Sequence, residues 1–103
     1  MMKARFFVGQ IVWHNRFGYR GVVFGVDAEF GLSEEWYEEM ARSRPPKDRP
    51  WYHVLVDGAL HSTYVAERHL QASDDLSQID HPWLGEYFGR YDGERYHTII
   101  PAQ

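Results

Sequence analysis

The most regular hydrophobic pattern in the chain covers residues 50–58, with the sequence PWYHVLVDG. Apolar side chains occupy both sets of alternating positions, so we expect an interior strand that is buried on both faces. Pro50 suits the first position of this strand because it cannot donate a ladder hydrogen bond. Asp57-Gly58 supplies the positive φ of a tight hairpin turn. The sequence therefore predicts a hairpin whose second strand returns over residues 60–65.

Two earlier stretches have strand composition and are separated by a short turn. Residues 6–14 (FFVGQIVWH) and 19–27 (YRGVVFGVD) are rich in β-branched and aromatic side chains, which favour a pleated surface. Residues 15–18 (NRFG) are typical of a turn. Gly21 and Gly25 lie inside the second stretch and predict bulges or sharp bends. Such bends let a short strand curl into a small barrel.

The hydrophobic period changes after the second strand. Leu32, Trp36 and Met40 recur every four residues, which predicts an amphipathic helix. Ser33 is placed to cap this helix, and we expect a helical insertion over about residues 33–44. Glutamates follow the cap and arginines lie near the end, in agreement with the helix dipole. The prolines of the next segment stop the helix and form an extended linker.

The C-terminal third predicts less regular structure. Residues 66–70 indicate a helical turn, and residues 73–103 form an extension that begins with a polar loop. Residues 81–88 are aromatic but too short and too interrupted for a regular helix. An Asp-Gly pair within residues 91–96 predicts a terminal hairpin. Residues 98–103 are expected to fray or to cover a strand edge.

Composition restricts the class of protein. A chain of 103 residues is long enough for one hydrophobic core, so we expect a single domain over residues 1–103. Aromatic residues make up 17% of it, which favours a compact β-rich core. It has no cysteine, which excludes disulfides and thiolate chemistry. It has neither an apolar run near the roughly 20 residues of a membrane span nor a signal-peptide pattern, so we expect a cytoplasmic protein without membrane contact.

Charge is distributed in blocks along the chain. The net charge is −4, but residues 1–20 carry only basic charges and residues 21–41 carry only acidic ones. Residues 42–49 are again mostly basic. Such blocks predict either one basic and one acidic face, or mutual neutralisation on an ordinary solvated surface. The first alternative would allow a nucleic-acid surface on an acidic protein.

No catalytic or metal-binding pattern is present in the sequence. His53 and His61 face each other across the predicted hairpin, near Asp57, but they lack the spacing of the metal-binding motifs. Ser62 does not complete a triad with its neighbour, because adjacent strand residues point to opposite faces. We therefore predict no metal and no cofactor. A binding module without enzymatic activity is the expected class.

Five segments in the same order resemble a known family. They are FVGQIV with the following His14, FGYRGVV, LSEEWY, PWYHVLV and TYVAE, within residues 7–14, 17–23, 32–37, 50–56 and 63–67. Together they span a core of residues 6–72 that resembles the heat-shock protein HspQ family, also called the YccV-like or hemimethylated-DNA-binding domain. Residues 81–96 resemble the longer tail of some bacterial members.

The resemblance implies a mainly β fold: a small SH3-like β-barrel of about five strands, with the helical insertion and the C-terminal extension, and without catalytic activity. Members are described as binding hemimethylated DNA. They are also described as bacterial stress-induced factors that promote degradation of proteins, including the replication initiator, by the ATP-dependent Lon protease. We therefore expect a module that binds hemimethylated DNA. The alternative is an adaptor whose partners are Lon and its substrates.

The DNA hypothesis requires basic side chains, because phosphate neutralisation dominates the affinity for duplex. An aromatic or apolar contact in the major groove is also required to discriminate a methylated adenine. The first hairpin turn and the proline linker supply the candidates, which are Arg16, Tyr19, Arg20, Arg42, Arg44, Lys47 and Arg49. The alternative role for these arginines is pairing with the helix dipole or simple surface solubility.

The adaptor hypothesis requires an exposed apolar surface or a free strand edge. The candidate contacts lie on the helical insertion and in the C-terminal extension, and they are Trp36, Tyr37, Met40, Trp83 and Phe88. The alternative is that each of these side chains packs on the barrel. An open barrel edge would also favour self-association into a homo-oligomer.

Overall fold

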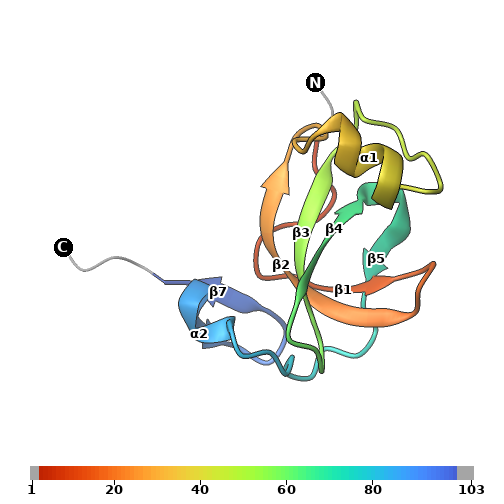
Figure 1. Cartoon of the computed structure of the whole chain (residues 1–103). Helices are drawn as coiled ribbons and strands as arrows, with labels where there is room; N and C mark the ends of the chain where they lie inside the picture. The colour runs from red at the N-terminus through yellow and green to blue at the C-terminus, as the bar shows by residue number, and fades with distance from the viewer. Residues whose placement is uncertain (1–2, 100–103) are drawn as a thin grey trace.

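The computed structural model describes residues 3–99 and is built mainly of antiparallel β-strands (Figure 1). A five-stranded sheet has the order β4-β3-β2-β1-β5 and consists of β1 (Ile11–His14), β2 (Tyr19–Asp27), β3 (Trp51–Val56), β4 (Ser62–Ala66) and β5 (Leu70–Ala72). A separate ladder joins β6 (Phe88–Tyr91) and β7 (Tyr96–Thr98). The helical elements are α1 (Glu34–Met40), the 3-10 turn η1 (Glu67–His69) and α2 (Leu84–Tyr87). The predicted mainly β class is confirmed.

β3 lies inside the sheet, between β2 and β4, and is buried on both faces as its sequence predicts. Tyr52 and Val54 pack into one core cluster, and Leu55 packs into a second cluster on the opposite face. Gly58 has a φ of +76° in the turn that leads to β4. This is the left-handed conformation that the Asp-Gly signal predicts.

The five-stranded sheet curls strongly in Figure 1 but is not closed by hydrogen bonds. β4 and β5 are its two edge strands, and in residues 3–99 neither edge is paired with a further strand. η1 connects the two edges. A hydrogen bond of 2.7 Å between the hydroxyls of Tyr19 and Thr63 ties β4 to the start of β2. Because a seam stays open between β4 and β5, the SH3-like barrel remains a prediction.

The two glycines inside β2 have different roles. The register between β2 and β3 shifts between Val23 and Gly25, so a bulge occurs at Gly25 as predicted. Gly21 instead keeps the regular register. A Cβ at Gly21 would lie 2.4 Å from Val54 Cγ1 and 2.6 Å from the Leu55 carbonyl oxygen. Gly21 is therefore required by the close approach of β3.

Helix α1 begins where the sequence predicts and ends earlier. The Ser33 hydroxyl accepts a hydrogen bond of 3.1 Å from the Trp36 backbone N–H. The helix packs on the sheet through Tyr37 and the following Ala41, which are buried, whereas Met40 is 61% exposed. The amphipathic helix is confirmed, and its buried positions are Tyr37 and Ala41, which lie beside the predicted Leu32–Trp36–Met40 spacing. No helix in residues 3–99 combines the length and hydropathy needed to cross a membrane.

The C-terminal extension covers the second face of the sheet. Ile79, Phe88 and Tyr96 pack against Ile11 and Leu55 in one buried cluster. The predicted terminal hairpin is present as β6 and β7, with a glycine of φ +99° in its turn. The extension therefore supplies half of a core. Thr98, the first residue predicted to fray or to cover a strand edge, instead ends β7 and pairs with Phe88. Residues 100–103 of that prediction fall outside the described residues.

Candidate nucleic-acid interface

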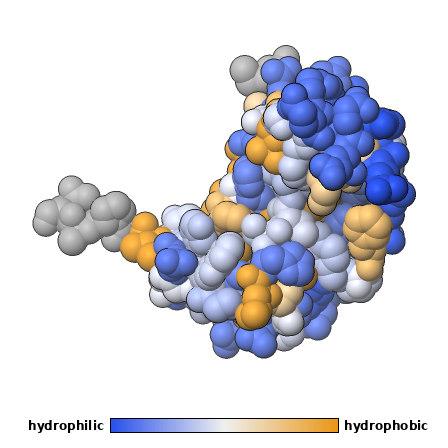
Figure 2. All heavy atoms as spheres, viewed as in Figure 1, coloured by the Kyte–Doolittle hydropathy of each residue, from blue (hydrophilic) through white to orange (hydrophobic). Residues whose placement is uncertain are grey.

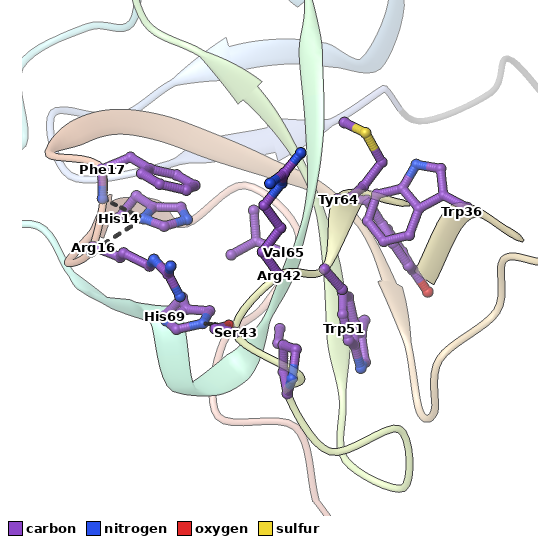
Figure 3. Close-up of a pocket in the computed structure, with 14 residues that line it drawn as sticks. His14, Arg16, Phe17, Trp36, Arg42, Ser43, Trp51, Tyr64, Val65 and His69 are labelled. Atoms are coloured by element: carbon purple, nitrogen blue, oxygen red, sulfur yellow. Dashed lines mark hydrogen bonds between the residues drawn. The ribbon is translucent and has the colours of Figure 1, made fainter. Parts of the chain in front are cut away.

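A pocket of about 190 Å³ opens between α1, β4 and the β1–β2 turn (Figure 3). Its aromatic lining is Phe17, Trp36, Trp51 and Tyr64, and its basic lining is His14, Arg16, Arg42 and His69. No carboxylate lines it. We call this site the arginine–aromatic pocket. Such a lining suits a planar anionic ligand, because rings offer stacking surfaces and guanidinium groups attract negative charge.

The aromatic wall is fixed by contacts among its rings. Trp51 is fully buried and stacks on Tyr64, with ring centroids 5.2 Å apart and an angle of 25° between the planes. Trp36 meets Tyr64 edge to face, with centroids 5.6 Å apart. The Tyr64 hydroxyl donates a hydrogen bond of 2.5 Å to Asp27. Burial and this bond raise the pKa of Tyr64, so its hydroxyl stays protonated and the ring stays in place.

His14 has one ring nitrogen engaged and one facing the pocket. Its Nδ1 accepts hydrogen bonds from the backbone N–H groups of Arg16, at 3.2 Å, and Phe17, at 3.0 Å. Burial, followed by the nearby His69 and Arg16, lowers the pKa of His14 to about 4. The neutral ring must therefore carry its proton on Nε2. This Nε2–H has no hydrogen-bond partner in residues 3–99 and reaches solvent, because no buried side-chain nitrogen or oxygen there is left without a partner.

A second histidine lies beside the first. The rings of His14 and His69 are nearly parallel, with centroids 5.7 Å apart. His69 Nε2 lies 2.8 Å from the Ser43 hydroxyl, and the Arg68 guanidinium donates to the Ser43 carbonyl at 2.6 Å. Burial, Arg68 and Arg16 together lower the pKa of His69. The lowered pKa values of both histidines are partly caused by a local excess of positive charge.

The positive surface continues past the pocket. A second hollow, of about 160 Å³, shares Ala66 with it and is lined by three further arginines and one acid, Glu67. The Glu67 carboxylate accepts a hydrogen bond of 2.6 Å from the Tyr52 hydroxyl. We define the arginine surface as Arg5, Arg16, Arg42, Arg49 and Arg68. None of its members forms an ion pair in the part of the chain that the structure describes. Figure 2 shows hydrophilic residues dominating the end of the molecule near α1.

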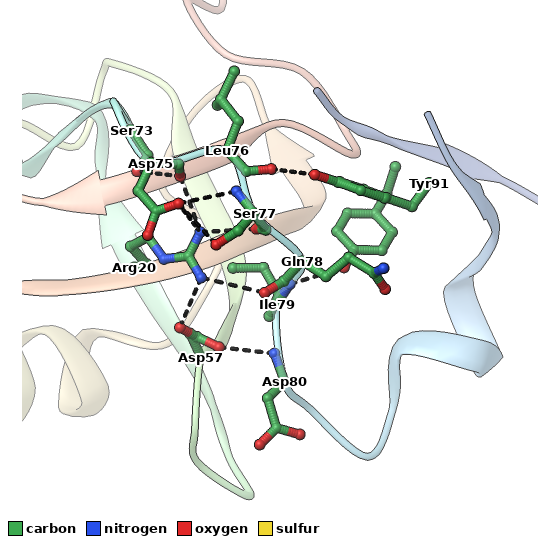
Figure 4. Close-up of polar contacts among 11 residues, drawn as sticks. Arg20, Asp57, Ser73, Asp75, Leu76, Ser77, Gln78, Ile79, Asp80 and Tyr91 are labelled. Atoms are coloured by element: carbon green, nitrogen blue, oxygen red, sulfur yellow. Dashed lines mark hydrogen bonds and ion pairs between the residues drawn. The ribbon is translucent and has the colours of Figure 1, made fainter. Parts of the chain in front are cut away.

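Arg20, a predicted DNA contact, lies elsewhere and is already bound (Figure 4). Its guanidinium forms an ion pair of 3.0 Å with Asp57 and donates to the carbonyl oxygens of Asp75, Ser77 and Gln78 at 2.8–3.2 Å. The side chain is only 12% exposed. Arg20 therefore anchors the polar loop after β5 to the β3–β4 turn. We call this cluster the Arg20 anchor.

Two further predicted contacts, in the linker after α1, are paired with acids of the helix. Arg44 forms an ion pair of 3.1 Å with Glu38 and donates to the Tyr37 carbonyl at 3.4 Å, at the C-terminal end of α1. Lys47 pairs with Glu34, and its ammonium lies 4.3 Å from the centre of the Tyr37 ring. The linker therefore does not present an uninterrupted basic run. Of the predicted DNA contacts, the structure brings Arg16 and Arg42 together at the pocket.

The predicted protein contacts also divide between the core and the surface. Tyr37 and Phe88 are buried in two different clusters. Trp36 is half-buried in the aromatic wall, while Met40 and Trp83 are exposed at opposite parts of the chain. Only the last three present side-chain surface to a partner.

A wider groove of about 550 Å³ adjoins the pocket along β4. Its lining includes Tyr19, residues Ser62–Val65 of the edge strand, and the exposed side chains of Leu32 and Met40. His53 and His61 also line it, but they do not face each other as predicted, because His53 pairs with Tyr64 and His61 lies opposite Val56. No group of three or more metal-ligating side chains gathers in residues 3–99.

Several residues of the interface are not identified from the sequence. His14 lies in a predicted strand, and Arg68 and His69 lie in a predicted helical turn, so neither segment carries a binding motif by itself. Arg5 and Ser43 are equally inconspicuous. The pair of adjacent basic residues Arg68-His69 is the only local signal. The site depends on the fold, which brings η1 against the β1–β2 turn.

The family comparison agrees with a nucleic-acid interface. No solved structure matches the chain. A family model described as "Hemimethylated DNA-binding protein YccV like" matches residues 4–95, which contain the arginine surface, the Arg20 anchor and most of the C-terminal extension. This match spans most of the 103 residues, more than the segments 6–72 that carry the sequence resemblance. The chain therefore belongs to the YccV-like family of hemimethylated-DNA-binding proteins.

Proposed function

We propose that this chain binds duplex DNA methylated on one strand, and that it does so through the arginine surface. The observation that supports this proposal is the contrast among the basic residues. Arg20, Arg44 and Lys47 are paired with acids, whereas the five members of the arginine surface have no ion pair in residues 3–99. Unpaired guanidinium groups on one surface of an acidic chain are available to phosphates.

Phosphate contacts set the expected salt dependence. Each contact that releases a counterion contributes about −0.9 to the slope of log K against log salt. If all members of the arginine surface engage phosphates, the slope is roughly −4 to −5. Binding is therefore expected to be strong at low salt and to weaken steeply as salt increases.

Reading of a methyl group requires an apolar contact at a base edge. Phe17 is 72% exposed at the β1–β2 turn, and the Arg16 guanidinium lies 5.6 Å from the centre of its ring. Phe17 is therefore close to a group that contacts phosphate. The nearby Tyr19 is half-buried and is held by Thr63, which makes it the less accessible of the two aromatic candidates.

The test is equilibrium binding to unmethylated, hemimethylated and fully methylated duplexes of one sequence over a salt series. In the variant Arg16→Ala/Arg42→Ala, we expect the salt slope to become shallower by about 1.8. The matched control Arg90→Ala/Arg95→Ala removes the same charge from exposed positions in the β6–β7 hairpin and its turn. Equal slopes in the two variants, or absence of binding at low salt, would contradict the proposal.

A second function is favoured by the free outer edge of β4. The groove along this edge is lined by Met40 and Leu32, which suits an extended segment of another protein added as a further strand. This supports the adaptor role for the ATP-dependent Lon protease and substrates such as the replication initiator. The measurement is the rate of initiator degradation by purified Lon with and without the chain. No acceleration would exclude this role.

Both roles are compatible with a bacterial cytoplasmic protein that has an SH3-like barrel and the open seam described above. The free edge of β4 is also the surface through which we would expect self-association. Analytical ultracentrifugation of the same preparation, with and without duplex, distinguishes a homo-oligomer from a monomer that binds DNA.

A further inference from the structure

We infer that the arginine–aromatic pocket receives a single base turned out of the DNA duplex, while Arg16 and Arg42 hold the flanking phosphates. This inference rests on the proposed DNA binding and adds the way in which one base is recognised. It is carried by the size of the pocket, its aromatic walls, an N–H donor that opens on it and the absence of acids from its lining.

The volume of the pocket matches a ligand with a single planar ring system. Its volume is about 190 Å³. A dry protein cavity of about 150 Å³ is sufficient for benzene, whereas pockets for drug-sized ligands measure about 300–1,000 Å³. A planar base therefore fits as a single unit, and a longer side chain with its backbone does not.

The walls supply stacking surfaces on two sides. In Figure 3, Trp36 and Tyr64 lie on one side of Arg42, and Phe17 lies on the other side over His14. The Phe17 and His14 rings are stacked, with centroids 4.8 Å apart. Stacking on aromatic side chains is how proteins hold unpaired bases, since every base has a π-face.

A polar donor distinguishes this pocket from a simple apolar gap. His14 lines the pocket, and the hydrogen bonds of the described residues engage only its Nδ1. No buried side-chain nitrogen or oxygen in these residues lacks a partner, so the Nε2–H is open to solvent. Its other nitrogen is fixed by two backbone N–H groups, so the ring cannot turn to satisfy Nε2 elsewhere. An acceptor nitrogen or oxygen on a base edge would replace water on this donor.

Charge identifies the source of the base. Arg16 and Arg42 line the pocket, and no carboxylate does, in a chain whose net charge is −4. A base attached to a sugar-phosphate backbone brings negative charge to both arginines at once. In a stacked duplex the base faces its partner and does not reach such a pocket, so it must leave the helix.

Leaving the helix is costly, and the cost gives a direct test. A mispaired base needs less energy to leave than a paired one. We therefore compare two hemimethylated duplexes that differ only in whether the methylated adenine is matched or mispaired. The expected result is at least tenfold tighter binding of the mispaired duplex with the same salt slope. Equal affinities for the two duplexes, with normal salt dependence, would overturn the inference and leave the proposed function intact.

Pocket variants locate the effect. Phe17→Ala and Trp36→Ala are each expected to reduce the preference for the mispaired duplex to less than threefold without changing the salt slope. Phe17→Ala changes a side chain that is mostly exposed, so it tests the pocket even if Trp36→Ala fails to fold. The matched control is Trp83→Ala, an exposed tryptophan that packs against His81 instead of the pocket. A preference that survives both pocket substitutions overturns the inference.

Three further ligands test the source of the base. If single-stranded DNA binds more tightly than the mispaired duplex, this result would overturn the extrusion of a base from a duplex. Adenosine monophosphate or a phosphotyrosine peptide that binds the pocket, when no duplex binds, would overturn both this inference and the proposed function. We expect that neither adenosine monophosphate nor the phosphotyrosine peptide competes for the pocket. We also expect the mispaired duplex to bind more tightly than the matched one.

Discussion

The Arg20 anchor and the arginine–aromatic pocket use the same residue type in opposite ways. Arg16 and Arg20 are close together in one basic block of the sequence, on the turn and at the start of β2. Arg20 meets two carboxylates and three backbone carbonyls and is mostly buried. Arg16 lies over the Phe17 ring and is one cause of the lowered pKa values of His14 and His69. The surroundings that the fold supplies therefore decide whether an arginine is structural or available to a ligand.

The difference has an energetic basis. A buried guanidinium is stable only when its donors are satisfied, and the Arg20 anchor satisfies them internally. At the pocket the positive charges are left near one another, which favours binding of an anion. The same contrast predicts that substitutions at the anchor affect folding and that substitutions at the pocket affect affinity.

The largest expected effect is that of Arg20→Ala. Removing one partner of a largely buried ion pair costs about 3–5 kcal/mol, because the remaining carboxylate and carbonyls lose their donors. Asp57 is itself partly exposed, so we expect about 3 kcal/mol, measured by urea denaturation. Arg90→Ala, an exposed control on β6, is expected to change stability by less than about 0.5 kcal/mol. A loss below about 1 kcal/mol for Arg20→Ala would remove the distinction between the two sites.

The next effect comes from placing an acid at the pocket. Met40 is exposed and lines both the pocket and the adjoining groove. In Met40→Glu the new carboxylate would compete with phosphates for Arg42, so the DNA affinity is expected to fall roughly tenfold and the salt slope to become shallower by about 0.9. Met40→Gln has a similar shape without charge and is expected to bind like the original chain. Equal affinities of the two variants would contradict a role for pocket charge.

Much of the fold is predictable because its signals are local. The Asp57-Gly58 turn, the Ser33 cap and the apolar run of β3 each depend on a few adjacent residues, and all three are present. The exposed Met40 is less predictable. Leu32, Trp36 and Met40 have helical spacing, but which stripe of α1 becomes buried depends on where the helix meets the sheet.

The site is less predictable because its contacts are distant in sequence. Arg20 is bound by Asp57 and by the loop after β5, and no residue near Arg20 in the sequence indicates these partners. The acids that pair with Arg44 and Lys47 lie on α1, where they predict only a solvated helix. Charge blocks indicate that a basic surface is present but not which arginines remain unpaired.

A smaller effect is expected at the cap of α1. Ser33→Ala removes the hydrogen bond to the Trp36 N–H and is expected to cost about 1 kcal/mol in stability. Because α1 carries Trp36 and Met40 of the pocket, the substitution is also expected to weaken the mispair preference. The Arg20 anchor has no contact with α1, so it should be unaffected. Asn at the same position preserves the cap and is the matched control; a loss equal to that of Ser33→Ala would contradict the assignment.

The smallest effect near neutral pH concerns His14. The unfolded chain has the ordinary histidine pKa of 6.5, whereas burial, His69 and Arg16 lower the pKa in the folded chain to about 4. In this pH range the unfolded state binds a proton at His14 and the folded state does not. The free energy of unfolding therefore falls as the pH decreases from about 6.5 toward about 4. His69 contributes in the same direction. Down to pH 6 the loss from His14 is below about 1 kcal/mol.

His14→Asn separates this titration from the geometry of the turn. An Asn carbonyl oxygen can accept the N–H groups of Arg16 and Phe17, as His14 Nδ1 does, but it does not titrate. Denaturation at pH 7, 6 and 5 is expected to show a weaker pH dependence in the variant, by roughly one proton per molecule at the acid end. Arg20→Ala leaves His14 in place and should retain the original pH dependence. If His14→Asn also retains the original pH dependence, then the titration of His14 is not the cause of the loss of stability in acid.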